Sequence, residues 1–226
     1  KFITEYNEAV DSGIDFYASQ TVKAPDGKII LIGWMQNWDT CNLTDRGNRN
    51  WFGQMSIPRE LSLKNGKLVQ NPIKEIEAYR ISKTSINDVN IDGEYSPENL
   101  QGRIIDMEVT IRPKEEKSLH SFTINLAQSE KYKISLEYKA NNHTLTFDRC
   151  NTEMRNAVCS QSVCKVSDLQ ELKLRILLDT YSAEVFVNDG QQVMTNTFYI
   201  EPSAKKISFN SVGSAVVNST KYDLHF

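Results

Sequence analysis

The amino-acid sequence predicts an all-β protein, and two observations carry this prediction. Short polar turns rich in Asn, Asp and Gly separate runs of β-forming residues, which is a strong local signal for β-hairpins. Apolar and polar residues also alternate along several segments, as they do in antiparallel strands with one buried face and one wet face. Helical periodicity is scarce. Only Pro72–Arg80 has apolar residues at helical spacing, and an extended strand competes there.

Each predicted strand follows from one of these two signals. The turns Pro25–Lys28, Asn65–Gly66 and Asn188–Gly190 join Phe16–Val22 to Ile29–Met35, Leu61–Leu63 to Lys67–Val69, and Ala183–Val187 to Gln192–Phe198. Alternation marks further strands through Phe122, Ile124 and Leu126, through Ile134, Leu136 and Tyr138, through Leu172, Leu174, Ile176 and Leu178, and through Tyr222, Leu224 and Phe226.

The chain divides into two parts near Tyr79–Lys83. Before this point, strands come in hairpins with a long polar loop, Asp39–Asn50. After a polar stretch, Ser85–Gln101, strands recur at short intervals to the end, which is the spacing of an antiparallel sandwich. We therefore expect two domains, residues 1–80 and residues 81–226.

Composition excludes several classes of protein. The 226 residues are 39% hydrophobic and 24% charged, as in an ordinary globular chain, with a net charge of -3 that provides no basic patch for nucleic acid. No apolar run reaches the roughly 18 residues that span a bilayer, so no membrane partner is expected. The chain starts at Lys1 without a signal-peptide core, which predicts a processed or truncated start and assigns no compartment.

The four cysteines predict neither a disulfide scaffold nor a metal site. Cys159 and Cys164 are loosely spaced, and no second Cys/His pair lies near them to complete a tetrahedral site. The other two are Cys41 and Cys150. Free thiols, no metal and no cofactor are expected, while pairing of the cysteines stays open.

An aromatic group in the first part has the composition of a sugar site. Its members are Phe16, Tyr17, Trp34, Trp38, Trp51 and Phe52. If one strand carries both Trp34 and Trp38, they share a face with Gln36, while Met35 and Asn37 point the other way. Sugar CH groups stack on aromatic rings while hydroxyls bond to polar groups. The alternative is that these rings are core residues of a sheet.

Five segments resemble glycoside hydrolase family 32, the β-fructosidases that cleave sucrose, inulin and levan. Asp11–Ala18, Gly33–Trp38 and Ser56–Leu61 occur in the order found in the family's last propeller blade, and Phe147–Arg149 and Leu178–Gly190 resemble its C-terminal sandwich. The resemblance implies the last blade of a five-bladed β-propeller followed by an antiparallel β-sandwich.

The same resemblance suggests site residues. It implies that Trp34 lies beside the pocket for the terminal fructosyl ring, and that Tyr17 and Asp15 are candidates for the pocket wall. The alternative for Asp15 is that it caps the start of an ordinary strand. Glu184 corresponds to a structural position in the family's sandwich, and no cofactor is implied.

No catalytic residue is predicted in this chain. Retaining glycosidases need two carboxyl groups roughly 5–5.5 Å apart, and the family's Asn-Asp-Pro, Arg-Asp-Pro and Glu-Cys motifs do not occur. Asp11 and Asp15 are too widely spaced along an extended segment. Glu60 is expected to pair with Arg59 or a neighbouring cation. The chain alone is therefore expected to be inactive.

The sequence thus predicts the C-terminal portion of a retaining β-fructosidase that acts on sucrose, sucrose phosphate or fructans. Loops on absent blades would decide among these substrates. The alternatives are a non-catalytic carbohydrate-binding protein, a structural fragment or half of a split enzyme. The expected partners are a fructose-containing sugar and either a missing N-terminal half or a second copy, because an unclosed propeller leaves strand edges uncovered.

Overall fold

A computed structural model of the chain describes residues 3, 7–39, 53–153, 159–166 and 170–226. The all-β prediction is confirmed. Two antiparallel sheets contain the named strands, and the described residues include only two short 3-10 helices, η1 (Lys74–Tyr79) and η2 (Glu98–Leu100). The helical alternative for Pro72–Arg80 is therefore the observed one, as the single 3-10 segment η1.

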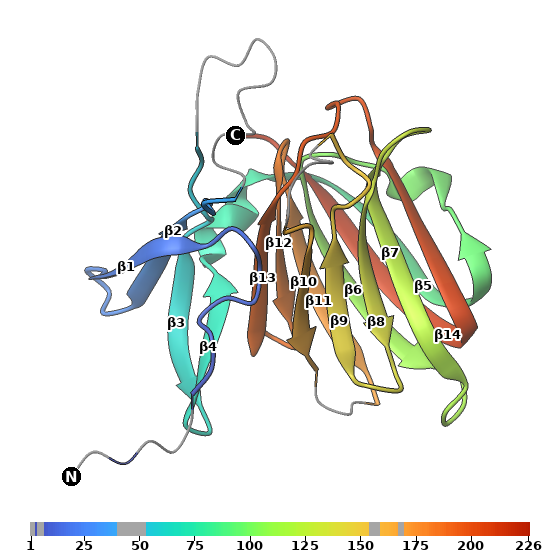
Figure 1. Ribbon diagram of the computed structural model, residues 1–226, viewed down its shortest axis with the longest axis horizontal. Coiled ribbons are helices and arrows are strands. Elements are labelled where there is room, and N and C mark those ends of the chain that lie inside the picture. The colour runs from blue at the N-terminus through green and yellow to red at the C-terminus, as the bar shows by residue number, and fades with distance from the viewer. Residues whose placement is uncertain (1–2, 4–6, 40–52, 154–158, 167–169) are drawn as a thin grey trace.

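The first sheet has four strands in the order β1-β2-β3-β4 (Figure 1). Its strands are β1 (Tyr17–Lys23), β2 (Ile29–Trp34), β3 (Arg59–Lys64) and β4 (Lys67–Pro72). The hairpins predicted at Pro25–Lys28 and Asn65–Gly66 are confirmed. Gly27 and Gly66 both have positive φ, the conformation that these turns require of glycine.

Two strand ends in this sheet differ from prediction. β1 begins at Tyr17 because the preceding backbone bonds elsewhere: the Asp15 N–H donates to the Thr195 carbonyl oxygen of the second sheet, 3.0 Å away. β2 ends at Trp34, where pairing passes to an isolated bridge with Met55. Trp38 therefore does not belong to the same strand as Trp34.

The second sheet has ten strands in the order β10-β9-β8-β7-β14-β6-β11-β12-β13, with β5 also paired to β14 (Figure 1). The strands are β5 (Arg80–Tyr95), β6 (Ile105–Pro113), β7 (Leu119–Gln128), β8 (Ile134–Lys139), β9 (Thr144–Asp148), β10 (Gln161–Lys165), β11 (Leu172–Leu178), β12 (Ser182–Val187), β13 (Gln192–Thr197) and β14 (Lys206–Leu224). The Asn188–Gly190 hairpin is confirmed, and so is the alternation through Ile134–Tyr138 and through Leu172–Leu178. The alternation predicted through Tyr222, Leu224 and Phe226 is wrong, because Phe226 is exposed while Lys221, on the opposite face, is buried and donates to the Gln101 carbonyl oxygen.

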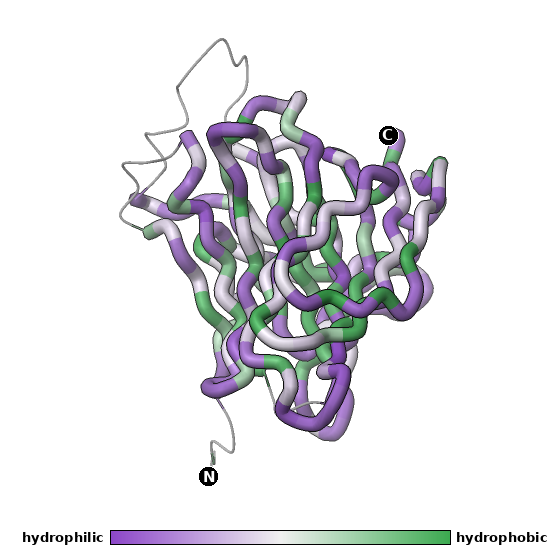
Figure 2. The backbone as a smooth tube through the Cα atoms, turned by 90° about the vertical axis from the view of Figure 1, so that its right-hand side faces the viewer, coloured by the Kyte–Doolittle hydropathy of each residue, from purple (hydrophilic) through white to green (hydrophobic). Residues whose placement is uncertain are grey.

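In a β-sandwich two separate sheets face each other, whereas here strand β14 connects the two halves into one sheet. Its first part pairs with β7 and its later part with β6, so the hydrogen-bonded ladder is continuous. The sheet folds back on itself around one apolar core, which unites side chains from both arms, such as Phe122 and Phe147 with Ile176 and Val185. Hydrophobic and hydrophilic residues alternate along its strands (Figure 2).

Most of the polar stretch Ser85–Gln101, in which the sequence predicted no strand, belongs to a strand. Residues through Tyr95 belong to β5, which pairs with β14 over most of its length. Only Ile86 and Ile91 of this strand are fully buried apolar side chains. A strand that buries so little has a weak binary pattern, and alternation therefore did not mark it.

The turn Asn188–Gly190 is pressed against the first sheet. Gly190 has φ +86°, and a Cβ built there would lie 2.0 Å from the Gln70 carbonyl oxygen. The Gly190 carbonyl accepts a hydrogen bond from the Gln70 N–H at 2.9 Å. Only glycine satisfies both the positive φ and this close approach.

We expect Gly190→Ala to lower the free energy of unfolding more than Gly27→Ala does, as measured by urea denaturation. Both replacements put a Cβ on a residue with positive φ, which costs about 1 kcal/mol. Gly27 has no atom within 4 Å of its would-be Cβ, whereas Gly190 adds a clash with backbone, worth about 1–3 kcal/mol more. Equal effects of the two substitutions would contradict this account.

Candidate functional site

Three aromatic side chains of the first part form the candidate sugar-binding surface, which we call the aromatic wall. Tyr17 lies opposite Trp34 in the β1–β2 pair. The ring centroids of Tyr17 and Trp34 are 6.3 Å apart and those of Tyr17 and Trp38 are 5.6 Å apart, both edge to face. Tyr17 is 45% exposed and Trp38 is 67% exposed. The wall therefore offers aromatic surface to a ligand. Trp51 and Phe52 lie outside the described residues.

The side-chain amides near the wall form hydrogen bonds with other groups of the protein. Gln36 is 7% exposed, and its Nε2 donates to the Asn37 carbonyl oxygen at 3.1 Å. The Asn37 side chain donates to the Asp15 carboxylate. The predicted arrangement, with Gln36 on the wet face between two tryptophans, is wrong because β2 ends at Trp34 and the alternation of faces stops with it.

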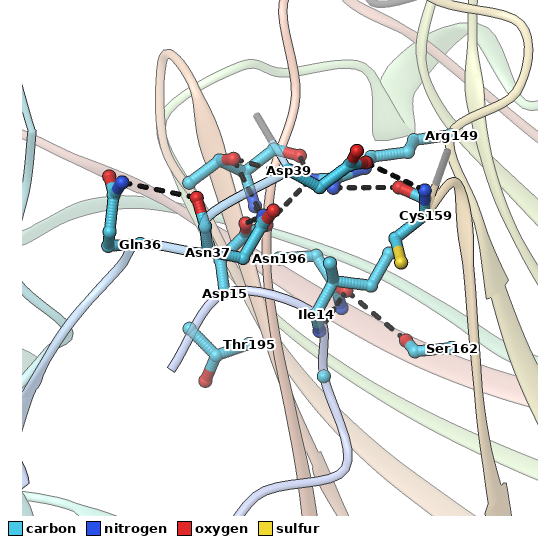
Figure 3. A network of polar contacts seen from close by, with 12 residues as sticks. Ile14, Asp15, Gln36, Asn37, Asp39, Arg149, Cys159, Ser162, Thr195 and Asn196 are labelled. Carbon is cyan, nitrogen blue, oxygen red and sulfur yellow. Dashed lines mark hydrogen bonds and ion pairs between the residues drawn. The ribbon is translucent and has the colours of Figure 1, made fainter. Parts of the chain in front are cut away.

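Asp15 is buried two residues before Tyr17, and its carboxylate is fully engaged (Figure 3). Oδ2 accepts hydrogen bonds from Arg149 Nη1 and from the Thr197 N–H, each at 2.6 Å. Oδ1 accepts from the Asn37 side chain. These contacts tie the start of β1 to the second sheet. A place for Asp15 in a pocket wall stays a prediction.

Two further contacts join the segments around the wall to the second sheet (Figure 3). The Asp39 carboxylate accepts from the Cys159 N–H at 2.9 Å. The Ile14 N–H donates to Asn196 Oδ1 at 3.0 Å, and that oxygen also accepts from Ser162 Oγ at 3.2 Å. The residues on both sides of the wall's strands are therefore anchored by the second sheet.

A second buried ionic cluster lies between the two sheets, around Arg59. Its Nη1 is 2.8 Å from Asp11 Oδ2 and its Nη2 is 2.6 Å from Glu184 Oε2, with all three side chains at most 2% exposed. The Arg59 guanidinium also lies 4.5 Å from the centre of the Phe16 ring and 5.5 Å from that of Phe186. Such a cation, placed between rings and carboxylates, links the sheets strongly.

The carboxylates weighed in the sequence are held in ion pairs. Burial raises the pKa of the Glu184 carboxyl, and the Arg59 charge acts in the opposite direction. Glu184 Oε1 also accepts from the Ile57 N–H at 2.6 Å, so its structural role is confirmed. Glu60 pairs with Lys28 at 3.1 Å, the neighbouring cation that the sequence allowed.

The described residues include no cluster of three or more His, Cys, Asp or Glu side chains that would hold a metal ion. In the same ranges, Cys150, Cys159 and Cys164 are free, and Cys41 lies outside them. No helix in the described part of the chain is long and apolar enough to cross a membrane.

Sequence reasoning missed the two arginines that hold the site. Both stand in segments that resemble the family, Arg59 after Pro58 and Arg149 after Asp148. Arg59 is the first residue of β3 and Arg149 directly follows β9, and each is 0% exposed. Their partners lie 125 and 134 positions away in the sequence. An arginine beside apolar residues was the available sign of a buried cation, but it does not predict which carboxylate the arginine pairs with.

Two family models match the chain. The model described as "Glycosyl hydrolases family 32 C terminal" matches residues 75–224, more than half of the chain, and the model of the family's N-terminal domain matches residues 1–72. The chain belongs to glycosyl hydrolase family 32. The resemblance drawn from its motifs is therefore confirmed.

Family 32 relatives align with this chain over most of its length. It is 31% identical to the sucrose-6-phosphate hydrolase of Escherichia coli over 92% of this chain and 42% of that protein. It is also 31% identical to the sucrose-6-phosphate hydrolase of Staphylococcus xylosus, over 95% of this chain and 43% of that protein. The chain thus spans less than half the length of these relatives.

Solved family 32 structures share the fold. The sucrose-6-phosphate hydrolase of Lactobacillus gasseri superposes with a TM-score of 0.77 at 22% identity, over 96% of this chain and 42% of that one. The exo-inulinase of Aspergillus awamori superposes with a TM-score of 0.81 at 21% identity, over 98% of this chain and 46% of that one. At this identity the likeness establishes the fold.

Proposed function

We propose that the protein is a β-fructosidase that hydrolyses terminal β-fructofuranosides with retention of configuration. The observation that carries the proposal is the match to both family 32 models in chain order, residues 1–72 and then 75–224. The names of the relatives, sucrose-6-phosphate hydrolase and exo-inulinase, indicate fructosides such as sucrose, its phosphate or fructans as substrates.

In this proposal, residues 1–80 are the last blade of a five-bladed propeller and residues 81–226 are the sandwich. The four-stranded sheet β1–β4 supports the first assignment, and the ten strands around one core support the second. The catalytic carboxylates would come from blades outside this chain, since the family's acidic motifs do not occur in it.

The chain's own contribution is part of the fructosyl pocket. Trp34 and Tyr17 would present ring surface to the sugar, and their contact in the aromatic wall supports a joint role. Asp15 would act from behind, by holding the start of β1 against Arg149. A bound sugar ring would exclude water from the wall and gain the burial of apolar area.

The remaining blades are the proposed protein partner. β1 is an edge strand of its sheet, and apolar side chains such as Val22 (62% exposed) and Leu63 (77% exposed) lie uncovered on it and on β3. An uncovered edge with apolar neighbours binds another strand readily. Without the other blades, a second copy of the chain would take their place.

Replacing Trp34 tests the proposal. We expect the protein, assayed together with the proposed further blades that carry the catalytic carboxylates, to release fructose from at least one of sucrose, sucrose 6-phosphate and inulin. We expect Trp34→Ala to lower kcat/KM about ten- to a hundredfold, because one buried aromatic contact is worth roughly 1.5–3 kcal/mol. The matched control is Tyr79→Ala, since Tyr79 is also an exposed aromatic residue, at 45%, and its ring packs on Phe226, which is not part of the wall.

The control should keep the activity of the parent protein. Release of no fructose from any of the three sugars, together with saturable sugar binding, would replace the proposal with a carbohydrate-binding role. Equal activity of Trp34→Ala and Tyr79→Ala would remove the aromatic wall from the pocket.

A further inference from the structure

Two cysteines flank the paired ends of β9 and β10, Cys150 shortly after β9 and Cys159 shortly before β10. The ladder pairs Leu145 with Cys164 and continues through Asp148 and Gln161. It extends one step further, because the Arg149 N–H donates to the Ser160 carbonyl oxygen at 2.9 Å. The next residue after Arg149 is Cys150, and the residue before Ser160 is Cys159.

Continuing the ladder one step beyond Arg149 and Ser160 would set Cys150 opposite Cys159 as a non-hydrogen-bonded pair, where the chain enters the turn Cys150–Asn151. The flanking pair Arg149–Ser160 is hydrogen-bonded, and such pairs alternate along an antiparallel ladder. The Cys150 N–H donates to Asp148 Oδ1 at 2.7 Å and the Cys159 N–H to Asp39 Oδ2 at 2.9 Å, so neither faces the other cysteine's backbone. Non-hydrogen-bonded pairs have Cα atoms about 4.5 Å apart, within the span of about 4.4–6.8 Å that a disulfide bridges.

The two side chains belong to the exposed face of the hairpin. They share the parity of Asp148 and Gln161, whose side chains already meet across the strands at 2.6 Å. Cys150 and Cys159 are both exposed. The Cys150 Sγ lies 3.0 Å from the Oγ of Ser160, the residue next to Cys159.

We propose that Cys150 and Cys159 form a reversible cross-strand disulfide. The oxidant is a small-molecule disulfide such as oxidised glutathione. One cysteine thiolate attacks a glutathione sulfur and releases one glutathione thiolate, and the second cysteine thiolate attacks the mixed disulfide and releases the other. Two cysteine thiols thereby lose two protons and two electrons, and one glutathione disulfide becomes two thiols.

This disulfide would lock the contacts that support the aromatic wall. Arg149 directly precedes Cys150, and its Nη2 donates to the Cys159 carbonyl oxygen at 3.0 Å while its Nη1 binds Asp15. The Cys159 N–H holds Asp39. Joining the two sulfurs would hold these groups together, and the midpoint of thermal unfolding should rise by about 5 °C or more.

The third described cysteine provides an internal control. Cys164 faces the core and its Sγ lies 3.6 Å from the Met194 sulfur. Burial raises the pKa of the Cys164 thiol to about 12, so it forms little thiolate at neutral pH. It should stay a thiol under conditions that oxidise the exposed pair.

Peptide mapping after mild oxidation tests the proposal. The protein is incubated with oxidised glutathione, free thiols are alkylated, and the digest is analysed by mass spectrometry before and after reduction. We expect a peptide pair joined through Cys150 and Cys159, an alkylated Cys164, and reversal by dithiothreitol. In Cys150→Ser, the exposed Cys159 should instead retain glutathione, because no resolving thiol remains.

Three outcomes would overturn the proposal. The first is alkylation of both exposed cysteines after oxidation. The second is persistent glutathione on either of them in the unsubstituted protein. The third is a bond from Cys159 to Cys41. The Cys41→Ser variant separates the last case, since it should leave the Cys150–Cys159 bond intact.

Discussion

Replacing Arg59 by methionine should lower the free energy of unfolding by about 3–5 kcal/mol, because breaking a buried ion pair leaves uncompensated charge in the interior. Here two carboxylates, Asp11 and Glu184, would lose their cation while at most 2% exposed. Methionine keeps most of the side-chain volume, so the loss reports charge and hydrogen bonding more than a cavity. Urea denaturation of the protein measures the effect.

A surface arginine supplies the matched control for this experiment. Arg112 pairs with Asp88 at 2.9 Å, but the two side chains are 47% and 70% exposed. Arg112→Met should change the free energy of unfolding by about 1 kcal/mol or less. Adding Glu184→Gln to Arg59→Met should restore part of the loss by removing one stranded charge. Similar effects of the Arg59 and Arg112 substitutions would show that the buried cluster does not join the sheets.

The second large effect is expected at Arg149. Its guanidinium is buried against Asp15 at 2.6 Å and also donates to the Thr197 carbonyl oxygen at 2.7 Å. Arg149→Met would leave the Asp15 carboxylate without a cation and should lower the free energy of unfolding by about 3–5 kcal/mol. The start of β1, and with it Tyr17, should loosen at the same time.

A double substitution separates stranded charge from lost packing at this position. Asp15→Asn removes the charge that Arg149→Met strands, so the double variant should be more stable than Arg149→Met alone. If the double variant is instead as unstable as the sum of the single effects, the Asp15–Arg149 ion pair does not couple the sheets. Amide hydrogen exchange at Tyr17 reports whether the aromatic wall loosens with the pair.

These two clusters give the second sheet a part in shaping the proposed pocket. Arg149 holds the residues just before Tyr17, and Arg59 packs over the Phe16 ring beside them. Gly33 leaves the space that Phe16 occupies, since a Cβ there would lie 2.3 Å from its ring. The position of the aromatic wall therefore depends on the second sheet, although that sheet contributes no residue to the wall.

Local chemistry was sufficient to predict most of the strands. A turn such as Asn65–Gly66 needs positive φ at both residues, and both have it. Alternation located β8, where Ile134, Leu136 and Tyr138 face the core. It failed for β5, which pairs with β14 yet buries only two apolar side chains fully.

The aromatic site was predictable in part, for the same reason. Tyr17 and Trp34 are neighbours across a hairpin that the sequence predicts, but a register shift between Tyr17 and Gln20 sets Tyr17 opposite Trp34 instead of Met35. Trp38 meets Tyr17 after β2 has ended, through a bend that alternation does not foresee. Gln36, expected on the wet face, is buried for that reason.

Strands, turns and family membership follow from residues near one another in the chain, because backbone propensity and side-chain alternation are local properties. The partners of Asp15 and Arg59 do not. Asp15 could have capped its own strand, yet it binds an arginine 134 positions away. Which buried charges neutralise each other depends on how two sheets dock, and only the tertiary structure decides that, because the desolvation that makes each pairing necessary arises from the packing itself.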